Sequence, residues 1–225
     1  MNSEKNEFIE TYFASWEERL DRAKILIDLE NYSYEGILVL CCYIGAFSSM
    51  RYPELQNGVA FKKTLLQYSN MKDFYEQIDL LFLYQWPRSI FRDNGNYKDL
   101  KNYQEIIGLL KNLYGEEKDL VKTNRFVLQQ EVIDCILKGS TISIDEENLK
   151  ERLPLFSLAE ILYRYVRCSA VHCATLEFIN STMCKDDAEE YILTSKLLWE
   201  TTLNIKNSLW RECIKSSKWP HELGM

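Results

Sequence analysis

Hydrophobic positions recur every three to four residues along most of the chain, which is the spacing of amphipathic helices. The clearest example runs from Glu7 to Leu29, and a stretch from Tyr34 to Met50 that is apolar almost all round comes after it. The first stretch predicts a helix with one buried face, and the second predicts a helix at the centre of the core. Ser33 is expected to cap this second helix, and Pro53 is expected to end it.

The same spacing predicts further helices over 59–68, 71–83, 97–114, 117–138, 145–153, 154–180 and 186–215. Gly115 is expected to stop one of them, residues 85–96 to form a loop, and residues 141–144 to form a short strand at most. Because no repeat or clear linker divides the chain, we predict an all-α helical bundle in one domain over residues 1–225. Its core would span about 8–180, with the long C-terminal helix over 186–215 added to it.

Composition limits the function classes. The chain has 225 residues, 46% of them hydrophobic, and a formal net charge of -7, so overall charge does not favour binding to nucleic acid and any RNA contact must be local. Seven cysteines form no CxxC pair, which indicates neither a disulfide framework nor a zinc site. We expect a cytoplasmic protein with no signal peptide, membrane span, metal or cofactor. Cys41 and Cys42 are expected to be reduced core residues, and the lysines from Lys206 to Lys218 to lie on solvated faces.

Candidate chemistry centres on a histidine, because the chain has only two. His221 lies in the C-terminal tail and is expected to be exposed and inert, whereas His172 lies five residues after Arg167. Arginine offers a fixed fork of N–H donors for phosphate, and histidine titrates near neutral pH. Together they indicate chemistry on a phosphodiester. In an ideal helix His172 lies about 80° from Arg164 but about 140° from Arg167, so Arg164 is the nearer partner unless the helix is distorted or a second subunit supplies half of the site.

The same helical spacing divides the motif segment into two faces. The face expected to pack on the bundle holds Leu158, Leu162, Tyr165, Ser169, Cys173 and Leu176. The opposite stripe holds Glu160, Arg164, Arg167 and Val171. Glu160 is most simply an ion-pair partner on the helix face, and its functional interpretation is to orient the arginine fork.

Arg167-x4-His172, preceded by Tyr163, resembles the R-x4-6-H signature of the HEPN superfamily. The apolar stretch from Tyr34 is similar to the second helix of prokaryotic HEPN proteins, and Phe61-x6-Tyr68 resembles the segment after that helix. The resemblance implies a HEPN-like fold and a homodimeric, metal-independent ribonuclease whose arginine and histidine from both subunits meet at the interface. It also implies a toxin or antiviral effector, with an antitoxin or regulatory protein as a partner.

On this resemblance, His172 would move the protons of RNA cleavage, and Arg167 would hold the phosphate and stabilise its developing charge. Many members carry a polar residue directly after the arginine and glycine after the histidine, where this chain has Cys168 and Cys173. A thiol cannot orient the arginine as an amide does, so Ser169 or Glu160 would substitute.

Two alternatives stay open from the sequence. Arg88 and Arg92 lie in the expected loop beside Trp86, where they would meet an RNA backbone while the aromatic ring stacks on a base, or where the loop would pack as a lid or interface. The bundle as a whole would serve either as a ribonuclease or as a non-catalytic helical interaction module. In the second interpretation His172 is a structural residue and Arg167 a solvated charge.

Overall fold

The structure is a computed structural model that describes residues 2–29, 32–86, 100–120, 122–168, 183–184 and 193–224. It is mostly helical, which confirms the predicted all-α class. Its contacts cluster into two compact units: unit 1 comprises residues 1–72 and 162–225, and unit 2 comprises residues 73–161. A single domain spanning both units stays a prediction.

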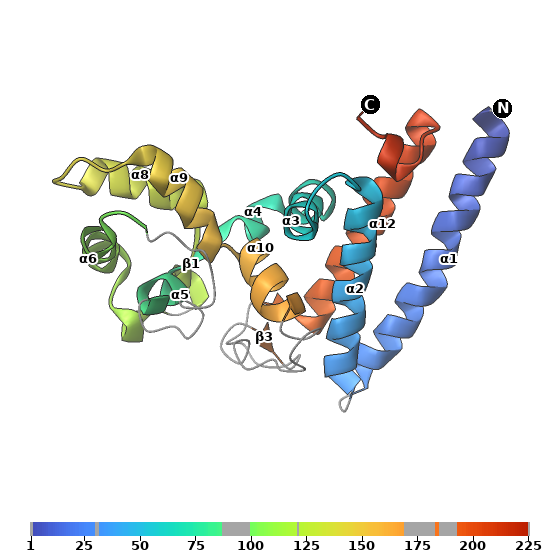
Figure 1. The fold of residues 1–225 in the computed structure, drawn as a ribbon. Helices are drawn as coiled ribbons and strands as arrows, with labels where there is room; N and C mark the ends of the chain where they lie inside the picture. Colours follow the sequence, from blue (N-terminus) through green and yellow to red (C-terminus); the bar gives the residue numbers. More distant parts are fainter. Residues whose placement is uncertain are drawn as a thin grey trace. The chain divides into compact units, whose positions relative to one another are not determined.

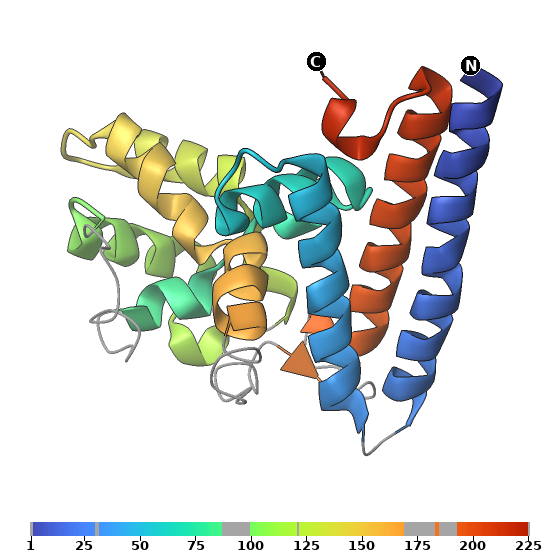
Figure 2. The same ribbon diagram turned by 45° about the vertical axis from the view of Figure 1, so that its right-hand side comes forward.

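Three long helices of unit 1 lie side by side: α1 (Asn2–Asp28), α2 (Ser33–Arg51) and α12 (Ser195–Ser216), with the shorter α3 (Asn57–Tyr68) beside α2 (Figures 1 and 2). The first two and α3 confirm the helices predicted from the apolar spacing. The buried stripe of α1 has that spacing and consists of Ile9, Phe13, Trp16, Leu20, Ala23 and Ile27. None of the described helices is long and apolar enough to span a membrane.

Helix α2 differs from the prediction in two details. Ser33 is the first residue of the helix and not its cap, because Tyr32 occupies the N-cap position without a side-chain hydrogen bond. Cys41 is buried as expected, but the neighbouring Cys42 is exposed, so its prediction as a core residue is wrong. The exposed side of the helix carries small residues that include Ala46 and Ser49.

Helix α12 begins at Ser195, nine residues later than expected, after the short β4 (Leu193–Thr194), which pairs in parallel with β3 (Met183–Cys184). The Thr194 hydroxyl caps it by accepting from the backbone N–H of Leu197. Lys206 corrects the expectation of a solvated face: its side chain is only 3% exposed, and its Nζ lies 2.6 Å from the Glu17 carboxylate. The stem of the lysine is therefore part of the contact between α1 and α12.

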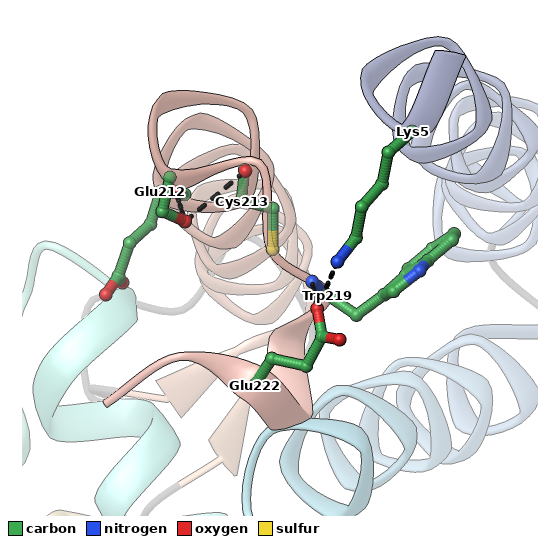
Figure 3. A network of polar contacts seen from close by, with 6 residues as sticks. Lys5, Glu212, Cys213, Trp219 and Glu222 are labelled. Carbon is green, nitrogen blue, oxygen red and sulfur yellow. Dashed lines mark hydrogen bonds and ion pairs between the residues drawn. The ribbon is translucent and has the colours of Figure 1, made fainter. Parts of the chain in front are cut away.

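The chain ends in a 3₁₀ turn, η7 (Pro220–Glu222), that is tied to α1 (Figure 3). Helix α12 stops where Ser217 adopts a left-handed conformation, with φ at 51°. The Glu222 carboxylate then accepts from the backbone N–H of Trp219 and from Lys5 Nζ, both at 2.7 Å. The hydrogen bond from Lys5 is the main cause that lowers the pKa of Glu222. His221 is exposed, as expected.

Unit 2 corrects two of the predicted helices. The stretches 71–83 and 117–138 are each interrupted by a strand, and the two strands, β1 (Gln77–Asp79) and β2 (Phe126–Leu128), pair antiparallel with Ile78 opposite Val127. The remaining elements are α4 (Lys72–Tyr75), α5 (Leu80–Gln85), α6 (Tyr103–Tyr114), η3 (Glu117–Asp119), α7 (Lys122–Arg125), α8 (Gln129–Gly139), α9 (Glu146–Arg152), η4 (Leu153–Phe156) and α10 (Leu158–Glu160). Helix α6 ends at Gly115, as predicted, and no strand forms over residues 141–144.

A buried ion pair joins the two interrupted segments. Asp79 is fully buried, and its two carboxylate oxygens accept from Arg125 Nε at 2.8 Å and Nη2 at 2.6 Å. The same carboxylate accepts from the backbone N–H of Phe82 and so caps α5. A two-pronged pair of this kind satisfies both charges inside the unit, and the strand pairing brings the two residues together.

Candidate functional site

The motif segment is not the continuous α-helix expected over 154–180. Pro154 lies in η4, the Ser157 hydroxyl caps α10, and the chain then winds as a π-helix, η5 (Ile161–Arg167). A π-helix closes i→i+5 hydrogen bonds, so the angles derived for 100° per residue do not apply to this stretch. His172 and Ser169 lie outside the described residues, and the pairing of His172 with Arg164 or Arg167 stays a prediction.

The expected packing face is confirmed where the structure describes it, because Leu158, Leu162 and Tyr165 are all buried. Glu160 is expected on the stripe opposite this packing face, as an ion-pair partner on the helix surface. It does not lie on the surface, because it is only 1% exposed. The cause is that α10 is buried all round, so a residue on either face lies inside the protein. The role of Glu160 in orienting an arginine stays a prediction.

Arg167, the predicted phosphate-binding residue, lines a pocket of about 270 Å³ within unit 1. Helix α2 contributes one wall, the first turns of α3 a second, and η5 a third. The lining residues are Cys42, Gly45, Ala46, Ser49, Asn57, Phe61, Tyr163 and Arg167. Since Cys42, Ala46, Ser49 and Asn57 are exposed, the pocket opens to solvent along these residues.

The guanidinium of Arg167 has few partners. Within the described ranges of the chain, its buried Nε has no hydrogen-bond partner, and its Nη1 donates only to Cys168 Sγ at 3.8 Å, a weak acceptor. Its Cζ lies 5.7 Å from the centre of the Tyr163 ring. Among the residues that the structure describes, no carboxylate pairs with Arg167. The side chain therefore brings a fixed positive charge to the pocket, and among the described residues only Cys168 accepts a hydrogen bond from it.

Close packing of α3 against η5 forms the back of the pocket. A Cβ on Gly58 would lie 2.7 Å from Tyr163 Cε1, so the tyrosine ring rests directly on the glycine backbone. The rings of Phe61 and Tyr163 are tilted against each other with 5.3 Å between their centres. This contact holds Tyr163, and with it the turn that ends in Arg167, against the beginning of α3.

The charge of Arg167 also acts on the buried thiol of Cys41. Burial raises the pKa of the Cys41 thiol to about 12, while the positive charge of Arg167 acts to lower that pKa. The effect of burial on this pKa is larger than that of the arginine charge, so Cys41 stays a neutral thiol at physiological pH. This agrees with its prediction as a reduced core residue.

The predicted RNA-contacting loop gains no support from Trp86. Its side chain is 6% exposed and packs edge-on against Phe82 and Phe156, with ring centres 5.6 and 5.5 Å apart. A ring buried in the core of unit 2 is not exposed for stacking on a base, and the choice between an RNA contact and a packed loop stays open for the rest of this segment. Arg88 and Arg92 lie outside the described residues.

Sequence reasoning missed the α2 and α3 walls of the pocket. The signal was present in the spacing of Cys42, Gly45, Ala46 and Ser49, which places four small residues on one side of α2. No comparable signal marks Asn57, which joins the pocket because α3 begins there. Among the residues described, no group of three or more His, Cys, Asp or Glu side chains is placed to hold a metal ion.

Comparison with known proteins adds no relative: no protein-family model, no curated protein and no solved structure matches the chain.

Proposed function

We propose that the protein is a metal-independent endoribonuclease of HEPN type, in which Arg167 binds the scissile phosphate and His172 transfers protons. The observation that supports the proposal best is the guanidinium of Arg167, which lines a solvent-open pocket with a buried Nε and no carboxylate partner in the described part of the chain. A surface arginine with a purely structural role would be expected to pair with an acidic side chain or to point into water.

The chemistry derives from the two residue types. His172 as a base takes the proton of the ribose 2′-hydroxyl, the 2′-oxygen attacks phosphorus, and the bond to the 5′-oxygen breaks as that oxygen receives a proton. Arg167 stabilises the extra negative charge that develops on the non-bridging oxygens. The products are a 2′,3′-cyclic phosphate and a 5′-hydroxyl end. One histidine cannot be base and acid in the same step, so the proposal includes a homodimer whose second His172 supplies the proton.

Cleavage of RNA by purified protein in EDTA tests the proposal directly. Arg167→Ala is expected to lower the rate about 100- to 1000-fold, and His172→Ala by about 100- to 10,000-fold. Arg211→Ala removes an exposed arginine of α12 that does not line the pocket, and it is the matched control for loss of positive charge. Full cleavage by either the Arg167 or the His172 variant would refute the assigned site.

Mixing the two inactive variants tests the shared site. If each site combines residues from two subunits, a heterodimer of Arg167→Ala and His172→Ala chains carries one intact Arg167–His172 pair but lacks the second histidine. The mixture should therefore regain a small part of the activity, with water in place of that histidine as the proton donor to the 5′-oxygen. A mixture that stays inactive at every ratio excludes sharing.

The biological role rests on the same resemblance. As a ribonuclease of this type, the protein would act in the cytoplasm as the effector of a toxin-antitoxin or antiviral defence system, restrained by an antitoxin or regulatory partner. Loss of cell growth on expression, relieved by Arg167→Ala, is the expected outcome; equal toxicity of the variant would exclude RNA cleavage as its cause.

A further inference from the structure

The pocket beside Arg167 offers more than a phosphate requires. A phosphate needs only N–H donors and positive charge, and the arginine supplies both. The rest of the lining combines apolar surface, from Phe61 and Ala46, with neutral polar groups, from Ser49 and Asn57. This mixture is typical of a site for a small organic group with hydrogen-bonding edges.

Helix α2 has no side chain that projects into the pocket at Gly45. A Cβ built on this glycine meets no described atom within 4 Å, which shows that open space reaches the backbone of α2. The neighbouring lining residues on that wall have short side chains. A flat group can therefore lie close to the helix, whereas a longer side chain at this position would occupy its place.

Size limits the occupant to one small group. The volume of about 270 Å³ falls just below the roughly 300–1,000 Å³ of ordinary small-molecule sites. The Asn57 amide presents both donors and an acceptor, and Ser49 adds a hydroxyl that can act as either. Hydrogen bonds of this kind recognise the edge of a nucleobase, while the apolar lining contacts its face.

We infer that the pocket binds one unstacked nucleobase of single-stranded RNA, next to the phosphate on Arg167, and that Asn57 reads the edge of that base. The inference rests on the proposed function, because it takes the phosphate on Arg167 to belong to RNA. A base inside a duplex is stacked and paired, so it would have to leave the helix at a cost before it could enter. The substrate is therefore single-stranded at this position.

Binding of the four ribonucleoside 5′-monophosphates to the full-length His172→Ala protein tests the inference by calorimetry. Gly45→Leu fills the pocket, and we expect it to weaken nucleotide binding at least about 10-fold, as loss of one base contact does. Gly108→Leu is the matched control: Gly108 is an exposed glycine inside α6, and its Cβ also meets no described atom within 4 Å. Leucine favours a helix more than glycine does, so both variants should fold. Equal nucleotide affinity of the two variants would overturn the inference.

Asn57→Asp tests the recognition of the base. The change keeps the size of the side chain, and an acidic residue is well tolerated in the first turn of α3. It replaces the amide donors with an acceptor, so we expect the order of affinity among the four nucleotides to change. A uniform weakening with the order preserved would show that Asn57 does not contact the base.

Two further outcomes separate this inference from the proposed function. If wild-type protein cleaves RNA in EDTA and Gly45→Leu cleaves it equally fast, the ribonuclease stands and the base pocket is refuted. If Gly45→Leu abolishes nucleotide binding but wild-type protein never cleaves RNA, the pocket stands and the ribonuclease is refuted.

With His172→Ala protein, a single-stranded oligonucleotide should bind at least about 10-fold more tightly than its duplex.

Discussion

Two glycines on one helix should respond to the same substitution with opposite signs. Gly36 and Gly45 both lie inside α2, and glycine in a helix costs about 0.5–1 kcal/mol relative to alanine. At Gly45 the added methyl group meets open space, so Gly45→Ala should raise the free energy of unfolding by roughly that amount.

At Gly36 the methyl group has no room. The Cβ would lie 2.3 Å from Ile27 Cγ2 and 3.2 Å from the backbone nitrogen of Ile27. Ile27 is buried in α1, and a β-branched side chain in a helix has one strongly preferred rotamer, so neither atom can move without shifting the helix. Overpacking of this kind costs about 1–3 kcal/mol. Because the propensity gain is similar in both variants, Gly36→Ala should be less stable than Gly45→Ala by about this cost.

Urea unfolding monitored by far-ultraviolet circular dichroism measures the difference. The midpoints should fall in the order Gly36→Ala, wild type, Gly45→Ala, if the overpacking cost exceeds the propensity gain. The comparison needs equal slopes, since a changed slope indicates an altered transition. Equal stability of the two variants would refute the close approach of α1 and α2 at Gly36.

Three further predictions concern buried or paired charges. Arg125→Met leaves the buried Asp79 carboxylate without its partner and should lower the free energy of unfolding in urea by about 3–5 kcal/mol. The double variant with Asp79→Asn should recover part of this loss. An unchanged free energy of unfolding in Arg125→Met would contradict the buried pair. Lys206→Met keeps the packing of the stem and removes an ion pair whose carboxylate is exposed, so its stability should stay within about 1 kcal/mol of wild type, and a larger loss would show that the pair matters. The folded pKa of Glu222 is lowered, so its contribution is present above the unfolded pKa and is lost as the pH falls through the folded value. An acid titration of Trp219 fluorescence should therefore show a step that Glu222→Gln lacks, and the same step in the variant would assign it to another group.

The sequence predicts α1 and α3 well because each buries a stripe whose period is that of a helix, and it predicts α2 because that stretch is apolar almost all round. The strand residues Phe126 and Val127 belong to a run with the same period, so their pairing with β1 is invisible to a local pattern. The deciding residue is Asp79, which lies far away in the sequence and reaches Arg125 only in the folded chain. Local spacing cannot carry that information.

The candidate site also has one part that the sequence indicates and another part that depends on the folded chain. The motif indicated Arg167, and the structure places this residue in the lining of a pocket, without a carboxylate partner among the described residues. The motif could not indicate Gly45 or Asn57, because these residues meet Arg167 only through the packing of α2, α3 and η5. It also assumed ideal helical angles, which the π-helical winding before Arg167 replaces.

The division of unit 1 into two chain segments has a consequence for synthesis on the ribosome. The α2 and α3 walls of the pocket are made before any of unit 2, whereas Arg167 is made only after all of residues 73–161. At roughly 5–20 residues per second, the interval between Phe61 and Arg167 is about 5–20 seconds. Throughout that interval the nascent chain holds the α2 and α3 lining residues without Arg167. If the protein is the ribonuclease proposed above, it cannot cleave the messenger from which it is translated until Arg167 and His172 have emerged.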